Sequence, residues 1–225
     1  MKARTMSFNT VLFDLDGTLL DTSEGLFLSL DETVERFGLS LPTPAQKKSI
    51  IGPPIDQSLH RIWNLDDEHT AEAADFFRKT YSERYLFKAM PYPGIAELLS
   101  KLSEDGWRTG IATYKRNDYA QRLMAATGLA QLCRFSLGSD GRSQTKADII
   151  RLCTDALGCP SPEYCIMVGD TTHDFLGAKK AGTAFIGVTY GFGFKTADEI
   201  LCLGALAASA NAQELGDALQ SLRKA

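Results

Sequence analysis

The sequence lacks the features by which membrane-spanning, secreted and disulfide-bonded proteins are usually recognised. No run approaches the roughly 18 apolar residues that a membrane span requires. Residues 1–6 are partly basic but lead into neither the apolar region nor the cleavage site of a signal peptide. The five cysteines are an odd number and contain no Cys-x-x-Cys pair. We therefore expect a cytoplasmic protein with reduced thiols.

An excess of basic charge is also missing. The chain has 24 lysines and arginines against 28 aspartates and glutamates, a net charge of −4. A mildly acidic chain offers no electrostatic footprint for nucleic acid or for an anionic membrane, so we expect neither partner. With 225 residues, of which 44% are hydrophobic, the chain can form one globular domain or one domain that carries an insertion.

Short apolar runs rich in β-prone residues recur along the chain, and each is followed by a polar or glycine-rich loop. The predicted strands are residues 10–13, 108–112, 134–137, 164–168 and 184–188. Helical spacing of apolar residues fills the intervals, as in residues 95–102, and Asn211 is a candidate N-cap for the last helix. Strands that alternate with helices predict an α/β fold with a parallel sheet covered on both faces.

One stretch breaks this alternation. Between about Leu20 and Met90 the apolar residues follow helical spacing, and no strand is predicted. Two short helices are expected around the turn Gly52-Pro53-Pro54, and a proline-rich segment marks the return to the sheet. We therefore predict a core formed by residues 1–19 and 91–225, with an all-helical insertion at residues 20–90.

Polar residues with related chemistry follow the predicted strands. In open parallel sheets, sites form at the carboxyl ends of the strands, so these residues are expected at one edge. They are Asp14, Asp16, Thr113, Lys146, Asp170 and Asp174. Carboxylates that share a site raise each other's pKa, which makes the arrangement costly without a cation.

A hard cation such as Mg²⁺ prefers oxygen ligands and retains phosphate as a co-ligand. The lysine ammonium and the threonine hydroxyl are suitable donors to phosphate oxygens. The combination predicts phosphoryl transfer that depends on Mg²⁺.

The order and spacing of these residues resemble the four motifs of the haloacid dehalogenase (HAD) superfamily. The matching segments are Asp14-x-Asp16-Gly17-Thr18, Thr113, Lys146 and Gly169-Asp170-x-x-x-Asp174, and the resemblance spans nearly the whole chain. It implies a Rossmann-like core with a C1-type helical cap inserted after the first motif. The segments 51–54 and 138–146 are similar to a branch that contains phosphoglycolate phosphatases and 5′-nucleotidases.

The resemblance also implies catalytic roles. Asp14 would attack phosphorus and form an aspartyl phosphate. Asp16 would protonate the leaving oxygen and then activate water. Thr113 and Lys146 would hold the phosphoryl oxygens. An aspartate at position 16 favours phosphate-ester hydrolysis, because dehalogenases, phosphonate hydrolases and ion pumps of the superfamily do not use an acid there.

Metal-binding and substrate-binding residues follow from the same resemblance. The implied metal-binding set is Asp14, Asp16 through its backbone carbonyl, Asp170 and Asp174. The implied substrate-binding set is Thr113, Tyr114, Lys146 and Gly52. Two departures stand out: Tyr114 occupies a position where close relatives often have asparagine, and no proline follows Lys146. The glycine-rich aromatic segment 190–194 lacks the spacing of a dinucleotide fingerprint and is expected to line the pocket.

The sequence thus predicts a Mg²⁺-dependent, phosphoglycolate phosphatase-like enzyme, a monomer or homodimer, that hydrolyses a small phosphorylated metabolite. A 5′-nucleotidase, a pyrophosphatase and a phosphomutase are alternatives on the same machinery. A non-catalytic phosphate-binding regulator is the alternative from another class, and such a protein should have lost Asp14 or Asp16. Two interpretations of Arg142 are open, a contact with the substrate or a position on a solvated loop.

Overall fold

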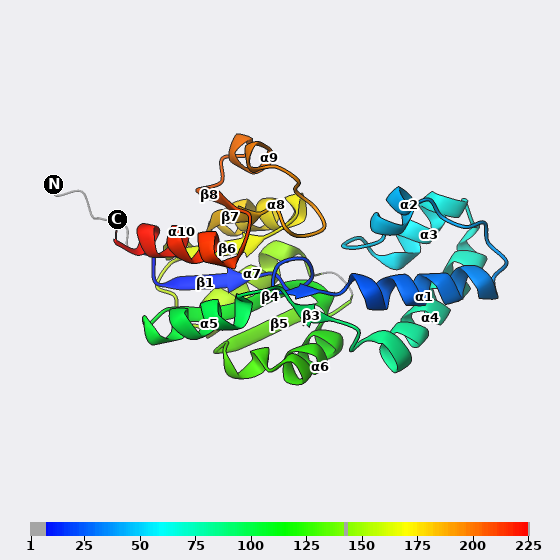
Figure 1. The fold of residues 1–225 in the computed structure, drawn as a ribbon, viewed down its shortest axis with the longest axis horizontal. Helices are drawn as coiled ribbons and strands as arrows, with labels where there is room; N and C mark the ends of the chain where they lie inside the picture. The colour runs from blue at the N-terminus through cyan, green and yellow to red at the C-terminus, as the bar shows by residue number, and fades with distance from the viewer. Residues whose placement is uncertain (1–7, 142–143, 225) are drawn as a thin grey trace. The chain divides into compact units, whose positions relative to one another are not determined.

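The chain divides into two compact units, one comprising Met1–Asp21 and Pro91–Ala225, the other Thr22–Met90. A computed structural model describes residues 8–141 and 144–224. Within them, the first unit contains a six-stranded sheet in the order β5-β4-β1-β6-β7-β8, with every neighbouring pair parallel (Figure 1). The strands are β1 (Thr10–Phe13), β4 (Arg108–Arg116), β5 (Phe135–Ser139), β6 (Cys165–Gly169), β7 (Ala184–Val188) and β8 (Ala207–Ser209).

The central strand β1 positions the acidic residues that follow it. Its four residues are all buried, as expected for a parallel strand covered on both faces. Phe13, its last residue, pairs with Ile111 of β4 and with Val168 of β6. The residues just beyond Phe13 and Val168 therefore emerge side by side at the carboxyl edge of the sheet.

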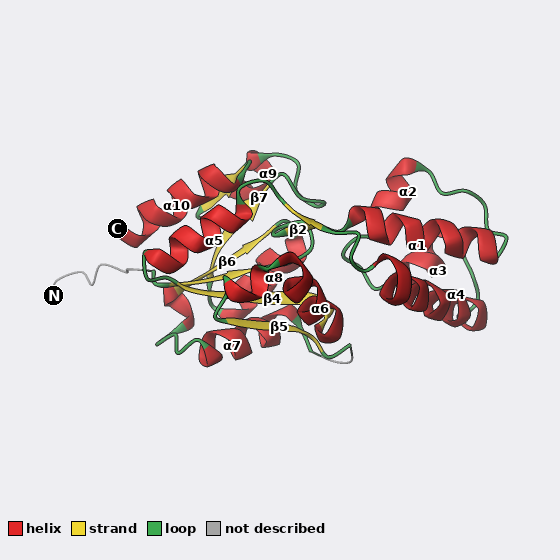
Figure 2. Ribbon diagram, turned by 60° about the horizontal axis from the view of Figure 1, so that its bottom comes forward, coloured by secondary structure: helices red, strands yellow, loops and turns green. Residues whose placement is uncertain are grey.

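Helices cover both faces of the sheet (Figure 2). On one face α5 packs against α10, and on the other α7 packs against α8. The helices of this unit are α5 (Ile95–Glu104), α6 (Asn117–Thr127), α7 (Lys146–Ala156), α8 (Thr172–Ala181), α9 (Ala197–Cys202) and α10 (Ala212–Lys224). Leu12, Ile150 and Met167 are fully buried in the core between the sheet and α7 and α8.

The second unit is helical. It contains α1 (Ser23–Arg36), α2 (Pro44–Lys48), α3 (Ile55–Trp63) and α4 (Asp67–Thr80), and α4 continues into a π-helical turn at Tyr81–Tyr85. Helix α4 packs against both α1 and α3. The chain passes between the units through β2 (Leu20–Asp21) and β3 (Met90–Pro91), which pair with each other in a separate small sheet.

The predicted α/β fold class is confirmed, and all five predicted strands are present with small shifts at their ends. Strand β4 runs on to Arg116 through a register shift after Ala112. The sixth strand, β8, was missed because Ala207-Ala208-Ser209 has no β-branched or aromatic residue to signal a strand.

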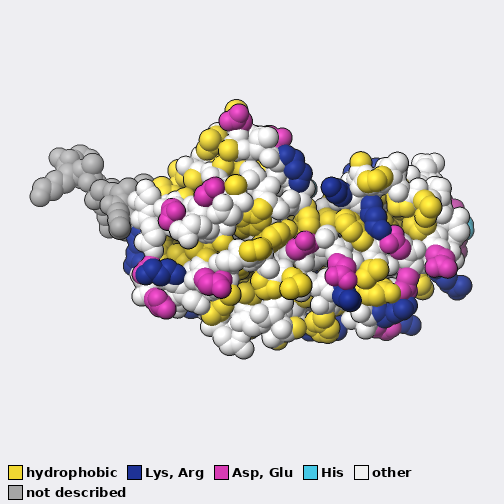
Figure 3. Space-filling model, in the orientation of Figure 1, with side chains coloured by type: hydrophobic (Ala, Val, Ile, Leu, Met, Phe, Trp, Pro, Cys, Tyr) yellow, Lys and Arg dark blue, Asp and Glu magenta, His cyan; other side chains and the backbone are white. Residues whose placement is uncertain are grey.

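The surface agrees with the modest net charge. Acidic and basic side chains are interspersed over the face drawn in Figure 3. Among the described residues, no helix combines the length and the apolar character needed to cross a membrane.

Candidate active site

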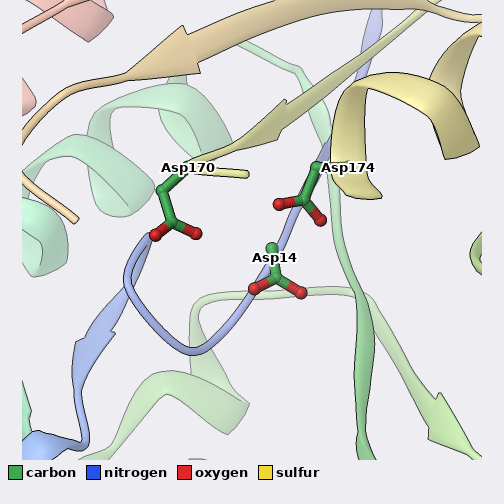
Figure 4. Close-up of side chains that lie close together, drawn as sticks. All are labelled: Asp14, Asp170 and Asp174. Atoms are coloured by element: carbon green, nitrogen blue, oxygen red, sulfur yellow. The ribbon is translucent and has the colours of Figure 1, made fainter. Parts of the chain in front are cut away.

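Three buried aspartates meet at the carboxyl edge of the sheet. Asp14 follows β1, Asp170 follows β6 and Asp174 lies in the first turn of α8. Their carboxylates face a common space, with one oxygen from each within 4.8 Å of the others (Figure 4). Asp170 is fully buried, and Asp14 and Asp174 are almost so.

Local backbone structure explains two of these positions. The Asp14 amide donates to the Val168 carbonyl at 2.9 Å, which extends the pairing between β1 and β6 by one residue. Asp174 belongs to a capping box at the start of α8, where its Oδ2 accepts from the Thr171 hydroxyl at 2.6 Å. The cap occupies Oδ2 and leaves Oδ1 of Asp174 for another partner.

That partner is Lys146, the first residue of α7. Its ammonium lies 2.5 Å from Asp14 Oδ1 and 2.6 Å from Asp174 Oδ1. The lysine stem crosses α8 at Gly177, where an added Cβ would lie only 2.5 Å from the Lys146 Cγ. A glycine at position 177 therefore lets α7 and α8 approach closely enough for the lysine to reach both carboxylates.

Burial and neighbouring charges shift the pKa values of Asp14, Asp170 and Lys146. Burial raises the pKa of Asp14 to about 7, opposed by Lys146 and reinforced by Asp174 and Asp170. Burial likewise raises the pKa of Asp170 to about 7, and Asp174 adds to the rise. Burial alone would lower the pKa of Lys146, but the attraction of Asp14 and Asp174 outweighs it and the pKa is raised.

The cluster has the composition of a site for a hard cation. One lysine cannot neutralise three carboxylates, so a negative charge remains uncompensated when all three are ionised. Oδ1 of Asp170 is buried and has no hydrogen-bond partner within the described part of the chain. An all-oxygen donor set with one unpartnered carboxylate oxygen fits a divalent ion such as Mg²⁺.

Asp16 does not join the three carboxylates with its side chain. Both of its oxygens accept from the Lys115 ammonium, at 2.9 and 3.2 Å. The Lys115 side chain is only 6% exposed, so this is a sheltered ion pair. The sequence interpretation missed Lys115 as a functional residue. Its signal was its position two residues after Thr113, near the end of the same strand.

The remaining predicted site residues occupy different settings. Thr113 is buried, and its hydroxyl oxygen accepts from the Lys115 amide at 3.2 Å. The Tyr114 hydroxyl accepts from the Lys146 amide at 2.8 Å, so this tyrosine supports the lysine. Gly52 belongs to the helical unit and adopts a φ of 103°. Arg142 lies outside the described residues.

Comparison with known proteins identifies the family. A family model for haloacid dehalogenase-like hydrolases matches residues 11–188. The chain belongs to this family. A 5′-nucleotidase of Pseudomonas aeruginosa is 34% identical over 195 residues, 86% of this chain and 88% of that protein. A phosphoglycolate phosphatase of Rhodospirillum rubrum is 32% identical over 218 residues, 92% of this chain and 89% of that protein.

The fold comparison agrees with the family assignment. The crystal structure of a predicted phosphatase from Clostridium acetobutylicum superimposes with a TM-score of 0.85 at 32% identity, covering 96% of this chain and 99% of that one. The predictions of the HAD-like family and of a phosphoric monoester hydrolase similar to phosphoglycolate phosphatase are thereby confirmed.

The Lys146 geometry yields a stability prediction. In metal-free buffer, Lys146→Met should lower the free energy of unfolding by roughly 3–5 kcal/mol, because it leaves buried carboxylates without their counter-charge. Lys101→Met is the matched control, since it removes an ion pair whose lysine is 63% exposed. Urea unfolding should give a cost within about 1 kcal/mol for the control. Equal small costs for both variants would contradict the role given to Lys146.

Proposed function

We propose that this protein is a Mg²⁺-dependent phosphatase that hydrolyses a small phosphate monoester through a phosphorylated Asp14. One observation carries the proposal: the buried Asp14 carboxylate is held at 2.5 Å by Lys146, beside Asp170 and Asp174. Fixing one carboxylate oxygen by an ammonium leaves the other oriented for attack at phosphorus. The same ammonium offers positive charge to a phosphoryl group that reaches Asp14.

The reaction proceeds in two displacements. A carboxylate oxygen of Asp14 forms a bond to phosphorus as the ester P–O bond breaks, and protonated Asp16 gives its proton to the leaving oxygen. Asp16 then takes a proton from water, whose oxygen attacks the acyl phosphate and releases inorganic phosphate and the free Asp14 carboxylate. Lys115 holds the Asp16 carboxylate apart from the three-carboxylate cluster. The Asp16 carboxylate is therefore available as the general acid and base and does not serve as a metal ligand.

The three carboxylates are the residues that would hold the metal. Asp14 and Asp170 would bind Mg²⁺ directly, with the Asp16 carbonyl, and Asp174 would support its water shell. When bound, the ion would offset the charge that develops on the phosphoryl oxygens. The unpartnered oxygen of Asp170 supports this assignment.

Substitution of the two aspartates in the first motif tests the chemistry. Asp14→Asn should abolish release of phosphate from p-nitrophenyl phosphate, because an amide is not a useful nucleophile. Asp16→Asn should lose roughly 10²–10⁴-fold in rate. Wild-type enzyme should be silent after dialysis against a chelator and active again with Mg²⁺.

Asp118→Asn, which changes an exposed aspartate, serves as the control and should keep wild-type activity. Circular dichroism establishes that each variant is folded. A folded Asp14→Asn variant with near wild-type turnover would end the covalent mechanism. Full activity in the presence of a chelator would show that the reaction does not need a metal ion.

The choice of ester requires residues beyond the core motifs, because those motifs engage only the phosphoryl group. We assign the choice to the helical unit as a C1-type cap, with the turn at Gly52 as its substrate-facing element. The names of the two relatives make 2-phosphoglycolate and nucleoside 5′-monophosphates the first candidates. We further propose a cytoplasmic monomer or homodimer acting on free metabolites, which cell fractionation and light scattering would check.

A pair of glycine substitutions tests the cap assignment. Gly52→Ala should change the rank order of kcat/KM across a panel of 2-phosphoglycolate, nucleoside monophosphates, sugar phosphates and pyrophosphate. Gly204→Ala is the matched control, because its φ of 93° is close to the 103° of Gly52 and both glycines have open space around an added Cβ. The control should therefore carry the same backbone strain without the change in rank order. A uniform loss in both variants would leave Gly52 with a structural role only.

A further inference from the structure

Asp170 is enclosed by the backbone of a loop that follows β7. Its Oδ2 accepts from the Phe192 amide at 2.7 Å and from the Gly193 amide at 3.1 Å. The Phe194 amide donates to the Asp170 carbonyl at 2.8 Å. Three successive amides of residues 190–194, the Asp170 loop, are thus committed to one aspartate. The sequence did not predict these backbone contacts of the segment.

The two glycines of the Asp170 loop are required by space. A Cβ added at Gly191 would lie 2.2 Å from the Gly17 carbonyl oxygen and 2.5 Å from Asp170 Oδ2. A Cβ added at Gly193 would lie 2.3 Å from the Asp170 carbonyl oxygen. Neither glycine has a positive φ, so the backbone conformation itself is open to any residue. Only close approach to Asp170 and to the first motif demands glycine at these positions.

The loop is also tied to the segment that carries Asp14. The Tyr190 hydroxyl donates to the Thr18 carbonyl at 2.9 Å, and the Tyr190 ring packs against Tyr92 with centroids 4.8 Å apart. One short segment therefore contacts both Asp170 and the backbone just beyond Asp14. This arrangement fixes the two aspartates relative to each other, although they come from different strands.

The two oxygens of Asp170 have contrasting environments. Oδ2 receives two amide hydrogen bonds, whereas Oδ1 is buried with no partner within the described residues. With Oδ2 fixed, the carboxylate cannot rotate freely, and one oxygen of Asp170 lies within 4.8 Å of oxygens of Asp14 and Asp174, in the space that the three carboxylates face. Leaving an ionised oxygen buried and unbonded is costly, and a cation at that position removes the cost.

We propose that the Asp170 loop is a positioning element for the divalent cation: it holds Asp170 Oδ2 so that Oδ1 is presented to a cation bound with Asp14. The inference rests on the proposed function, because it assumes that the three-carboxylate cluster binds the metal. Gly191, Gly193 and Tyr190 act through Asp170 and do not touch the cation or the substrate. Their loss should weaken metal binding more than substrate binding.

The test measures binding of Mn²⁺ alone, from the electron paramagnetic resonance signal of the free ion, together with the metal-free Tm of each variant. Gly191→Ala should raise the Mn²⁺ Kd roughly 10–100-fold, as expected when a residue that orients a ligand is lost. Tyr190→Phe loses one hydrogen bond and should raise the Kd about 2–10-fold. Gly216→Ala, in α10, is the control and should leave the Kd unchanged.

A second readout separates positioning from general stabilisation. At saturating Mn²⁺, the KM for p-nitrophenyl phosphate should stay near the wild-type value in Tyr190→Phe and Gly191→Ala, because added metal compensates for the weakened site. If Gly191→Ala does not fold, Tyr190→Phe alone carries the test. Folded variants that bind Mn²⁺ as tightly as wild type would overturn the proposal.

Asp170→Asn distinguishes this failure from failure of the proposed function. If wild type binds Mn²⁺, Asp170→Asn does not, and the loop variants bind as wild type does, only the role of the loop is wrong. If Asp170→Asn binds Mn²⁺ as wild type does, the metal site itself is misplaced and both proposals fall.

Discussion

A lysine ammonium buried between two carboxylates is the interaction on which the rest of this site depends. Lys146 is 3% exposed and contacts both Asp14 and Asp174. Removing three charged groups from water costs several kcal/mol per ion, and only good geometry among them compensates for that cost. The geometry requires β1 to end at Phe13, just before Asp14, α7 to begin at Lys146, and α8 to carry glycine at position 177. The positions of the charged groups in the site therefore depend on how the strands and helices of the core pack.

The positive charge of Lys146 does not balance the negative charges of the three carboxylates. Within the described part of the chain, Lys146 forms ion pairs with Asp14 and Asp174 but not with Asp170, one oxygen of which accepts from two backbone amides. The other oxygen has no partner within the described residues. A cation bound there, as we propose, would together with Lys146 surround an incoming phosphoryl group with positive charge. A mildly acidic protein would in this way bind a dianionic substrate at a cluster of carboxylates.

How far the sequence predicts the site depends on what each residue signals. Asp14 and Asp170 were predictable because each ends a buried apolar run, and parallel strands bring such ends together. Lys146 was predictable from its place in the motif pattern. Its contacts with both Asp14 and Asp174 were not, because they depend on how closely α7 approaches α8. Lys115 and the Asp170 loop were not predicted, because sequence patterns do not report ion-pair partners across strands or the direction of backbone amides.

Contacts that the sequence does not report also explain where the structure differs from the predictions. Asp16 was expected beside the other aspartates because it follows the first strand, and the family resemblance gave its metal contact to its backbone carbonyl. Its carboxylate engages Lys115, which extends from the neighbouring strand β4. Tyr114 was predicted to bind substrate, and its hydroxyl supports the Lys146 amide. A role for Tyr114 toward substrate stays a prediction. Strand β8 escaped because its alanines pack at the sheet edge without any β-branched residue.

The central claim is that Asp14 carries the phosphoryl group, and chemical trapping tests it most directly. The Asp16→Asn variant is mixed with Mg²⁺ and p-nitrophenyl phosphate, whose leaving group departs without a proton, so that mainly the second step is slowed. The reaction is quenched in acid, and the precipitated protein is redissolved in dimethyl sulfoxide and treated with sodium borohydride, which reduces an acyl phosphate to an alcohol. Peptide mass spectrometry should find the reduced side chain at Asp14, and not when a chelator replaces Mg²⁺. Substrate consumption in a single turnover with no modification of Asp14, or with phosphate on another residue, would contradict the account.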